Sequence, residues 1–265
     1  MTNDIHKLLD PFHKEDLDNL THPAIYIEHN DYHLLILRFP IQDEQQNVSL
    51  VSQGIVIKNN DIFLYNKVQQ QLIKLDGGWQ SLYKILDHNI DETLTLVNSF
   101  REEIIDMEES LYTQQITQKF LNNWFTIKKE LIRLNRVIER TTQTYEKFYQ
   151  KNEKNIQPFI HNFNDLLEHL TRSQRYMEHD IEKLNTIYNF YSARSNDTIN
   201  QSIYILTILS AIFLPLNLIV GFFGMNTGTL PFTQAGGTQN VIFILGSIFI
   251  TLFLFFLIKR NKRSI

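Results

Sequence analysis

The spacing of hydrophobic residues changes twice along this chain, and each change marks a different kind of structure. Between residues 24 and 66, short runs rich in β-branched and aromatic side chains predict strands over 24–27, 32–39 and 54–65. These runs are punctuated by Asn30-Asp31, Pro40 and Asn59-Asn60-Asp61, as is typical of turns. Gly77-Gly78 then closes a first section, 1–78, that we expect to be a small α/β domain.

The second section, 79–198, has the pattern of long helices. Glycine and proline are absent from 79–157 and from 159–214, and stretches of this length without either residue predict long helices. Apolar residues in both recur mostly at alternating steps of three and four, which predicts two heptad-like seams. The seams comprise Phe120, Trp124, Ile127, Leu131, Leu134, Ile138, Tyr145 and Phe148, and then Phe163, Leu166, Leu170, Met177, Ile181, Leu184, Tyr188 and Tyr191. They suit packing against each other as an antiparallel hairpin, or against neighbouring subunits. Pro158 suits the first turn of the second helix.

Two uncharged apolar stretches follow, 199–223 and 241–258. A helix of about 20 apolar residues crosses the hydrocarbon of a bilayer, so we predict two transmembrane helices within 199–258. Without a breaker ahead of it, the first would continue the preceding helix from Phe159 to Phe223, a length of about 97 Å. Such a continuous helix would connect a sensor in the cytoplasmic part mechanically to a gate in the membrane part. A linker at Ser195-Asn196 would divide the helix and break that connection.

The charges give an expected orientation in the membrane. The net charge of −4 is uneven: all 29 acidic residues lie at or before Asp197, while the tail 259–265 is basic. The positive-inside rule places that tail, and through two spans the N-terminal part, in the cytoplasm. We therefore expect a multi-pass membrane protein with both termini cytoplasmic. An acidic cytoplasmic part argues against nucleic acid as a partner and suits cations.

Two further features of composition narrow the setting. The chain has no cysteine, which excludes disulfides and thiolate metal sites and fits a reducing compartment. The polar start, 1–10, has no apolar core, so we expect no signal peptide.

Polar and small residues form one stripe on the first apolar helix. Spacings of three and four place its members on the same face: Asn200, Ile203, Thr207, Ser210, Leu214, Asn217 and Gly221. Such residues are costly against lipid, so the stripe either packs against another helix or lines a water-filled pore. Two helices cannot enclose a pore, and the second interpretation therefore requires a ring of subunits. Ile203 and Leu214 would be its hydrophobic constrictions or simple packing residues. Pro215 either bends the helix or is an ordinary tolerated membrane proline.

The tripeptide Gly224-Met225-Asn226 at the exit of this helix, followed by a second apolar helix and a basic tail, resembles the CorA-type divalent-metal transporters. A weaker match lies in Asp10–Leu17 and the following 32–38, with Asp10 where the family usually has His. The resemblance implies an α+β cytoplasmic domain with long stalk helices and two C-terminal transmembrane helices, assembled as a funnel-shaped homopentamer. The chain starts late relative to that family, so part of the usual sheet is expected to be missing. Its outer loop, 227–232, lacks the acidic residue of magnesium-type members and looks closer to the zinc-transporting ZntB branch.

The resemblance also implies roles for particular residues. Gly224, Met225 and Asn226 would form the outer mouth, where amide oxygens suit a hydrated Mg²⁺; otherwise Asn226 is a helix cap. Zn²⁺ finds none of its usual ligands in the span and should also pass hydrated. Asp165, Glu168 and His169 resemble a regulatory metal-binding region between subunits, with Asp43 a weaker partner, although most acidic residues on a long helix only form a solvated face. His22, His29 and His33 are not expected to be ligands.

Taken with these observations, the resemblance implies a homo-oligomeric, pentameric transporter or channel for Mg²⁺, Co²⁺, Ni²⁺ or Zn²⁺ in a bacterial-type inner (plasma) membrane, driven by the ion gradient or coupled to protons. Divalent cations would be its substrate and a possible regulator, with no other cofactor. Phosphate-binding loops and nucleophile motifs are absent, so we expect no enzyme. A membrane-anchored coiled-coil scaffold is the alternative from another class, and a channel opened by membrane tension is a third.

Overall fold

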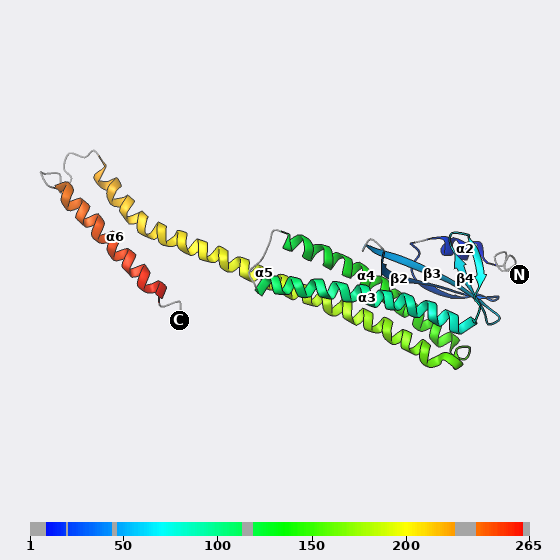
Figure 1. Cartoon of the computed structure of the whole chain (residues 1–265). Helices are drawn as coiled ribbons and strands as arrows, with labels where there is room; N and C mark the ends of the chain where they lie inside the picture. The colour runs from blue at the N-terminus through cyan, green and yellow to red at the C-terminus, as the bar shows by residue number, and fades with distance from the viewer. Residues whose placement is uncertain (1–8, 20, 44–46, 113–118, 226–236, 262–265) are drawn as a thin grey trace. The chain divides into compact units, whose positions relative to one another are not determined.

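The computed structural model describes residues 9–19, 21–43, 47–112, 119–225 and 237–261. The chain divides into two compact units, residues 1–189 and 190–265, which are treated separately below. Figure 1 shows the elements of both units along the chain.

The first unit contains a five-stranded antiparallel sheet in which neighbouring strands follow each other along the chain, in the order β1-β2-β3-β4-β5. A short helix, α2 (Pro11–Asp18), precedes it. The strands are β1 (Ile25–Glu28), β2 (His33–Gln42), β3 (Val48–Lys58), β4 (Asp61–Asn66) and β5 (Gln71–Lys74). Strands were predicted in the regions of β1, β2 and the β3–β4 hairpin. The sequence pattern did not indicate β5 or the first half of β3.

The turn between β3 and β4 follows from two asparagines. Asn59 and Asn60 have φ angles of 48° and 69°, and Lys58 pairs with Asp61 across the hairpin. Positive φ at both central residues is the geometry of a type I′ turn, which asparagine tolerates well. The side-chain oxygen of Asn60 also accepts a hydrogen bond of 2.8 Å from the indole N–H of Trp79, tying the turn to the first long helix.

Pro40 does not end its strand, contrary to the sequence prediction. β2 continues to Gln42, and Pro40 pairs with Leu50 of β3. Strand β1 pairs with β2 only as far as Ile36, so Pro40 lies where β2 has a single neighbour. A proline is tolerated at such an edge position because its missing N–H interrupts no second ladder.

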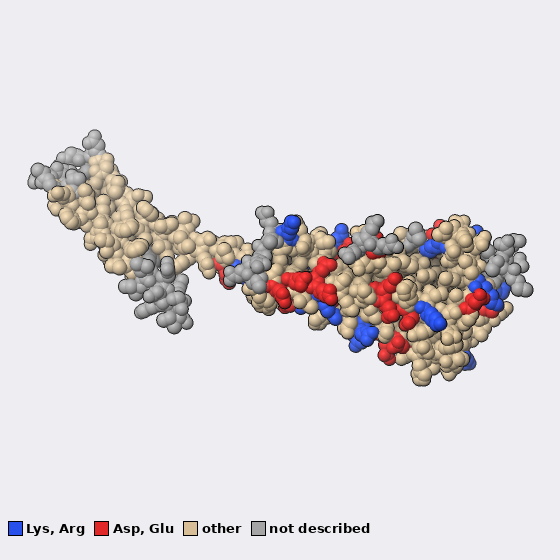
Figure 2. Space-filling model, viewed as in Figure 1, with Lys and Arg blue, Asp and Glu red and all other residues tan. Residues whose placement is uncertain are grey.

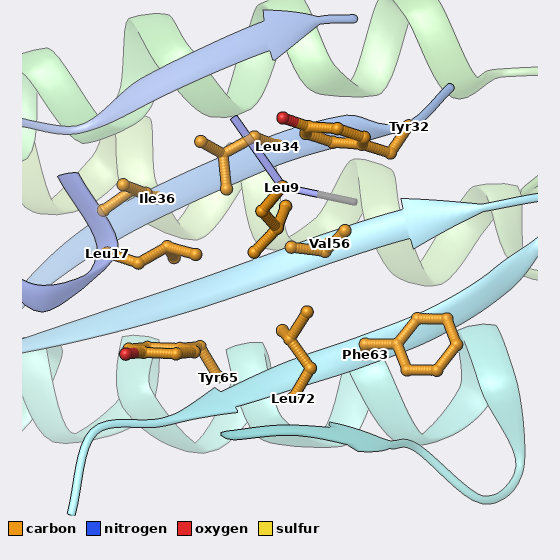
Figure 3. Packing of buried hydrophobic residues seen from close by; sticks show 9 residues of the cluster. All are labelled: Leu9, Leu17, Tyr32, Leu34, Ile36, Val56, Phe63, Tyr65 and Leu72. Atoms are coloured by element: carbon orange, nitrogen blue, oxygen red, sulfur yellow. The ribbon is translucent and has the colours of Figure 1, made fainter. Parts of the chain in front are cut away.

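Both faces of β2 are buried. One face contributes to a core that is covered by the N-terminal segment, with Leu17 of α2 1% exposed (Figure 3). That core comprises Leu9, Leu17, Tyr32, Leu34, Ile36, Val56, Phe63, Tyr65 and Leu72. The residues that alternate with these along β2 point to the opposite face. Among them, Leu35, Leu37 and Phe39 are also buried, on the side where β2 contacts two long helices.

The long helices are α3 (Gly78–Tyr112), α4 (Phe120–Asn152) and α5 (Ile160–Phe223). A 3-10 turn, η1 (Gln157–Phe159), contains Pro158 and leads into α5. The two predicted seams are largely confirmed, since most of their members are buried. Trp124 and Ile181 are only half-buried, Tyr188 is 41% exposed, and Ile187 is buried although the pattern omitted it.

Helix α5 runs without interruption for 64 residues, passing both Ser195-Asn196 and Pro215. The linker considered at Ser195-Asn196 is therefore absent. Among the described residues, one helix, Gln157–Phe223, is long and apolar enough to cross a membrane. The last helix, α6 (Gly237–Asn261), contains a shorter apolar stretch, Gln239–Phe255.

Candidate functional site

All seven members of the polar stripe are exposed on the single chain: Asn200, Ile203, Thr207, Ser210, Leu214, Asn217 and Gly221. Within the second unit, the less exposed residues of α5 lie on another face. They are Tyr204, Ile208, Ile212, Pro215, Leu216, Ile219 and Phe223. The less exposed residues of α6, Val241, Leu245, Ile248 and Leu252, likewise share one face. The stripe therefore lies on the more exposed face of α5.

The stripe offers oxygen atoms that can accept hydrogen bonds. Thr207 Oγ1 donates to the carbonyl of Ile203 at 2.8 Å, one turn earlier in the same helix. A hydroxyl whose proton is bonded to its own backbone presents its remaining lone pair outward. Such an atom can receive a hydrated cation through the protons of the ion's water molecules.

Helix α5 ends where the Gly-Met-Asn tripeptide begins. Gly224 N–H donates to the carbonyl of Val220 at 2.9 Å, and Met225 N–H donates to that of Phe222 at 3.4 Å. A Cβ atom at position 224 would lie 3.1 Å from the Val220 oxygen, so glycine allows this closing turn without crowding. Met225 is 48% exposed. Asn226, the residue predicted to contact the ion, lies outside the described residues.

Asp165 and His169 lie one turn apart on α5, with 3.5 Å between Asp165 Oδ1 and His169 Nε2. Glu168 accepts a hydrogen bond of 3.0 Å from the side chain of Asn164. These residues line a surface groove that also contains Arg172 and Arg175. Within the described part of the chain, no three His, Asp or Glu side chains gather closely enough to hold a metal ion.

Tyr83 and Asp87 of α3, which the sequence pattern did not single out, lie beside Asp165. Burial raises the pKa of Tyr83, and the charges of Asp87 and Asp165 raise it further, while a hydrogen bond from Asn162 opposes them. Tyr83 is thus flanked by carboxylates from α3 and α5. Sequence spacing could not reveal this meeting because the two helices are about 80 residues apart along the chain.

Asp43 has a structural role in the described part of the hairpin between β2 and β3. Its carboxylate accepts a hydrogen bond of 2.8 Å from Asn47 N–H, and its own N–H donates to the Asn47 carbonyl at 2.9 Å. The binding of a regulatory metal between subunits by Asp165, Glu168, His169 and Asp43 stays a prediction.

A buried carboxylate was also missed. Asp180 on α5 is 1% exposed and lies 3.5 Å from Arg101 Nε of α3. The Arg101 guanidinium in turn stacks over the ring of Tyr176, 4.1 Å from its centroid. Asp180 lies between Met177 and Leu184 of the predicted seam, and an acidic residue so close to an apolar seam is the one signal that could have indicated it.

A model of the CorA-like Mg²⁺ transporter protein family matches residues 4–260, nearly the whole chain. The chain belongs to this CorA-like family. The resemblance carried by Gly224-Met225-Asn226 is thereby confirmed at the level of the family, whose members are transporters rather than enzymes.

Among curated relatives, the cobalt/magnesium transport protein CorA of Thermotoga maritima is 23% identical over 186 residues, covering 68% of this chain and 51% of the relative. The zinc transport protein ZntB of Yersinia enterocolitica is 24% identical over 160 residues, covering 58% and 46%. The chain spans about half the length of these curated relatives.

Solved structures agree in fold. The CorA magnesium transporter of Methanocaldococcus jannaschii superposes with a TM-score of 0.78 at 19% identity, covering 96% of this chain and 85% of that one. The ZntB cytoplasmic domain of Vibrio parahaemolyticus gives a TM-score of 0.55 at 13% identity, covering 71% and 80%. A sheet combined with long helices is thus the CorA-like fold of this chain, and the α+β prediction is confirmed to that extent.

Proposed function

We propose that this chain is one subunit of a homopentameric transporter that conducts divalent cations across a bacterial inner membrane. The observation that carries the proposal is the polar stripe of α5. It is exposed along its whole length, lies opposite the less exposed face of α5, and leads directly into Gly224 and Met225. A scaffold held only by coiled-coil contacts would have no need for an uncharged polar stripe in this position.

In the proposed ring, one α5 helix from each subunit contributes its stripe to a central pore. Asn200, Thr207, Ser210 and Asn217 would pass the ion between hydroxyl and amide groups, and Ile203 and Leu214 would narrow the path. Asn226 would present amide oxygens at the outer mouth, together with Gly224 and Met225. Neutral oxygens suit a cation that keeps its water, because Mg²⁺ gives up its hydration shell reluctantly.

The candidate ions are Mg²⁺, Co²⁺, Ni²⁺ and Zn²⁺. Relatives named for cobalt and magnesium and relatives named for zinc match this chain with similar identity, so similarity alone does not select one. The described part of the stripe contains no carboxylate, imidazole or thiolate. Zn²⁺ would therefore be conducted in hydrated form, like Mg²⁺.

The proposal includes α6 as a second, outer span, with the large first unit and the basic tail on the cytoplasmic side. It also includes regulation by cytoplasmic metal bound between subunits. Asp165, Glu168 and His169 of one copy would then be completed by acidic groups of the next copy, with Asp43 as a weaker partner.

Flux into liposomes tests the proposal directly. Purified full-length protein is reconstituted, and entry of Mg²⁺ and Zn²⁺ is measured with and without a pH gradient for wild type, Asn226→Ala and Asn240→Ala. Asn240 is an exposed asparagine at the start of α6 and serves as the matched control. We expect flux in the wild type and in Asn240→Ala, and its loss or altered selectivity in Asn226→Ala.

Each alternative has its own outcome in this experiment. Absence of flux from a properly assembled wild-type ring would leave the scaffold. Unselective flux that appears only under osmotic stretch would indicate a tension-gated channel. Flux that follows the pH gradient would assign proton coupling.

A further inference from the structure

The last third of α3 presents an acidic and partly apolar surface, here called the acidic strip. Its residues are Glu102, Ile105, Asp106, Glu109 and Tyr112, whose spacing places them on one helix face. Ile105 is 41% exposed and Tyr112 is 70% exposed, so both side chains are accessible to a partner. Figure 2 shows acidic side chains gathered over this part of the first unit.

Carboxylates are crowded at the acidic strip. Glu103 and Asp106 line a groove between α3 and the start of α4, whose wall includes Phe120, Asn123 and Ile127. Burial raises the pKa of Glu103, and the neighbouring charge of Asp106 raises it further. Positive charge placed in this groove would favour the ionised forms of both carboxylates.

A surface of the opposite sign lies on α4, here called the basic groove. Its walls are formed by Trp124, Phe125, Lys128, Lys129, Ile132, Arg133 and Arg136. Phe125 is 62% exposed. Lys128 lies 4.6 Å from the centroid of the Trp124 ring and donates to the Asn185 side chain of α5 at 2.7 Å. Four cationic side chains and three apolar or aromatic side chains thus line the basic groove.

The two surfaces match in length. The acidic strip of α3 and the basic groove of α4 lie on different sides of the α4 helix. The acidic strip extends over about 15 Å of helix and the basic groove over about 18 Å, at 1.5 Å per residue. Phe120, Asn123 and Ile127 face the acidic side, whereas Trp124 and Lys128 turn toward α5, where the Trp124 indole N–H donates to the Leu184 carbonyl at 2.8 Å. One copy therefore offers both surfaces at once.

We propose that the acidic strip of one copy docks into the basic groove of the next copy. Carboxylates would meet Lys129, Arg133 and Arg136, and the exposed Ile105 and Tyr112 would cover Phe125 and Ile132. A contact between two different patches is heterologous, and repeated around an axis it closes a ring. The inference rests on the proposed function in requiring a ring, and adds to it which surfaces of the cytoplasmic unit join neighbouring subunits.

The absence of cysteine from the chain allows a clean cross-linking test. Asp106→Cys and Lys129→Cys, each central in its surface, are combined in the full-length protein, which is treated in detergent with a short thiol-to-thiol cross-linker. We expect a ladder of covalent oligomers ending at the ring. The matched pair Asp106→Cys with Gln150→Cys should give no ladder, because Gln150 is exposed on α4 about 30 Å from Lys129 along the helix.

The single cysteine variants distinguish the type of contact. A heterologous contact brings position 106 to position 129 of the neighbour, so neither single variant should form more than traces of dimer. Strong dimer formation by Lys129→Cys alone would indicate a two-fold contact and overturn the proposal. An assembled ring that fails to cross-link through 106 and 129 would also overturn it.

Charge exchange supplies a second, independent measurement. Arg133→Glu with Arg136→Glu should raise the protein concentration needed for assembly on the order of tenfold, measured by light scattering of the detergent-solubilised chain. Adding Glu102→Lys and Asp106→Lys should restore assembly in the same chain. Failure of this rescue contradicts the inference. Binding of the same variants to anionic lipid vesicles is measured as well, and a basic-groove variant that loses vesicle binding but assembles normally would also contradict it.

These results are separable from those on transport. A ring that cross-links as expected but conducts no ion would overturn the proposed function and leave the interface standing. Flux through a ring joined by other surfaces would do the reverse.

Discussion

At the scale of single residues, two buried threonines of the long helices donate hydrogen bonds to the sheet. Thr141 of α4 donates from Oγ1 to the carbonyl of Arg38 at 2.7 Å, and Thr93 of α3 donates to the carbonyl of Pro40 at 2.9 Å. Both threonines are fully buried. β2 is thus held by one hydroxyl from each helix, just beyond the point where β1 stops pairing with it.

Thr141→Val should destabilise the first unit by about 1–3 kcal/mol, because the Arg38 carbonyl would stay buried without its donor. Valine has nearly the same shape, so the loss reports the hydrogen bond rather than a cavity. Chemical denaturation followed by circular dichroism measures the change. Thr95→Val is the control, since Thr95 is exposed and bonds only within α3. Equal losses in both variants would refute this account.

Gly54 is required by close packing rather than by backbone conformation. A Cβ atom there would lie 2.4 Å from Leu17 Cδ2 and 3.2 Å from Tyr65 Cβ. Leu17 is itself buried in the core that α2 covers, so it has little room to move.

Gly54→Ala should therefore cost about 1–3 kcal/mol through overpacking. Combined with Leu17→Ala, the two changes should cost less than the sum of their separate effects, because the smaller side chain makes room for the new methyl group. Thermal unfolding of the four proteins measures the coupling. Strict additivity would show that Leu17 and Gly54 do not compete for the same space.

At the scale of elements, Arg101 and Asp180 join α3 to α5. The Asp180 carboxylate is buried, and Oδ2 is without a hydrogen-bond partner in the described structure, so Arg101 is its main compensating charge. Lys183 and Glu108, with 2.6 Å between Nζ and Oε2, form a second bridge between the same helices. A charged joint of this kind makes the pairing of α3 and α5 sensitive to single substitutions.

Arg101→Met should destabilise the bundle by about 3 kcal/mol, because it leaves a buried carboxylate uncompensated. Adding Asp180→Asn should recover part of the loss, since the remaining group is then neutral. The control is Lys84→Met, at an exposed position on the same helix. Denaturant titration gives the free energy of unfolding of each variant. A double variant that is less stable than Arg101→Met would contradict this account.

The stripe also makes a prediction for α5 as an element. Thr207→Val should lower ion flux roughly tenfold, equivalent to about 1.4 kcal/mol on the barrier, because it removes one of the stripe's polar oxygens. Ser202→Ala is the matched control, since Ser202 bonds its own helix carbonyl in the same way but lies off the stripe. Flux in reconstituted liposomes separates the two, and an equal response would remove the stripe from the conduction path.

At the scale of the whole molecule, the proposed contact between subunits is electrostatic at its rim. Raising salt from 0.1 to 1 M shortens the screening length from about 10 Å to about 3 Å. The yield of cross-linking between positions 106 and 129 should fall over this range. A yield that is independent of salt would show that the apolar residues, rather than the charges, hold the contact.

Local patterns anticipated much of the fold because they depend on near neighbours in sequence. The spacing of apolar residues indicated the long helices, the β-branched runs indicated strands, and Asn59-Asn60 indicated a tight turn. Gly224-Met225-Asn226 identified the CorA-like family before any contact was known. The regulatory role of Asp165, Glu168, His169 and Asp43 stays a prediction; the structure adds that Asp43 bonds Asn47 in its hairpin and that Asp165 and His169 pair on α5.

By itself, then, the sequence indicated the long helices, most of the strands, the apolar C-terminal helices and the family. Only the tertiary structure decided that β2 continues through Pro40, that Arg101 meets the buried Asp180, and that Tyr83 of α3 lies beside Asp165 of α5. The physical reason is range. Periodicity and turn chemistry act over a few residues, whereas these contacts join positions far apart in the chain and depend on which faces pack together.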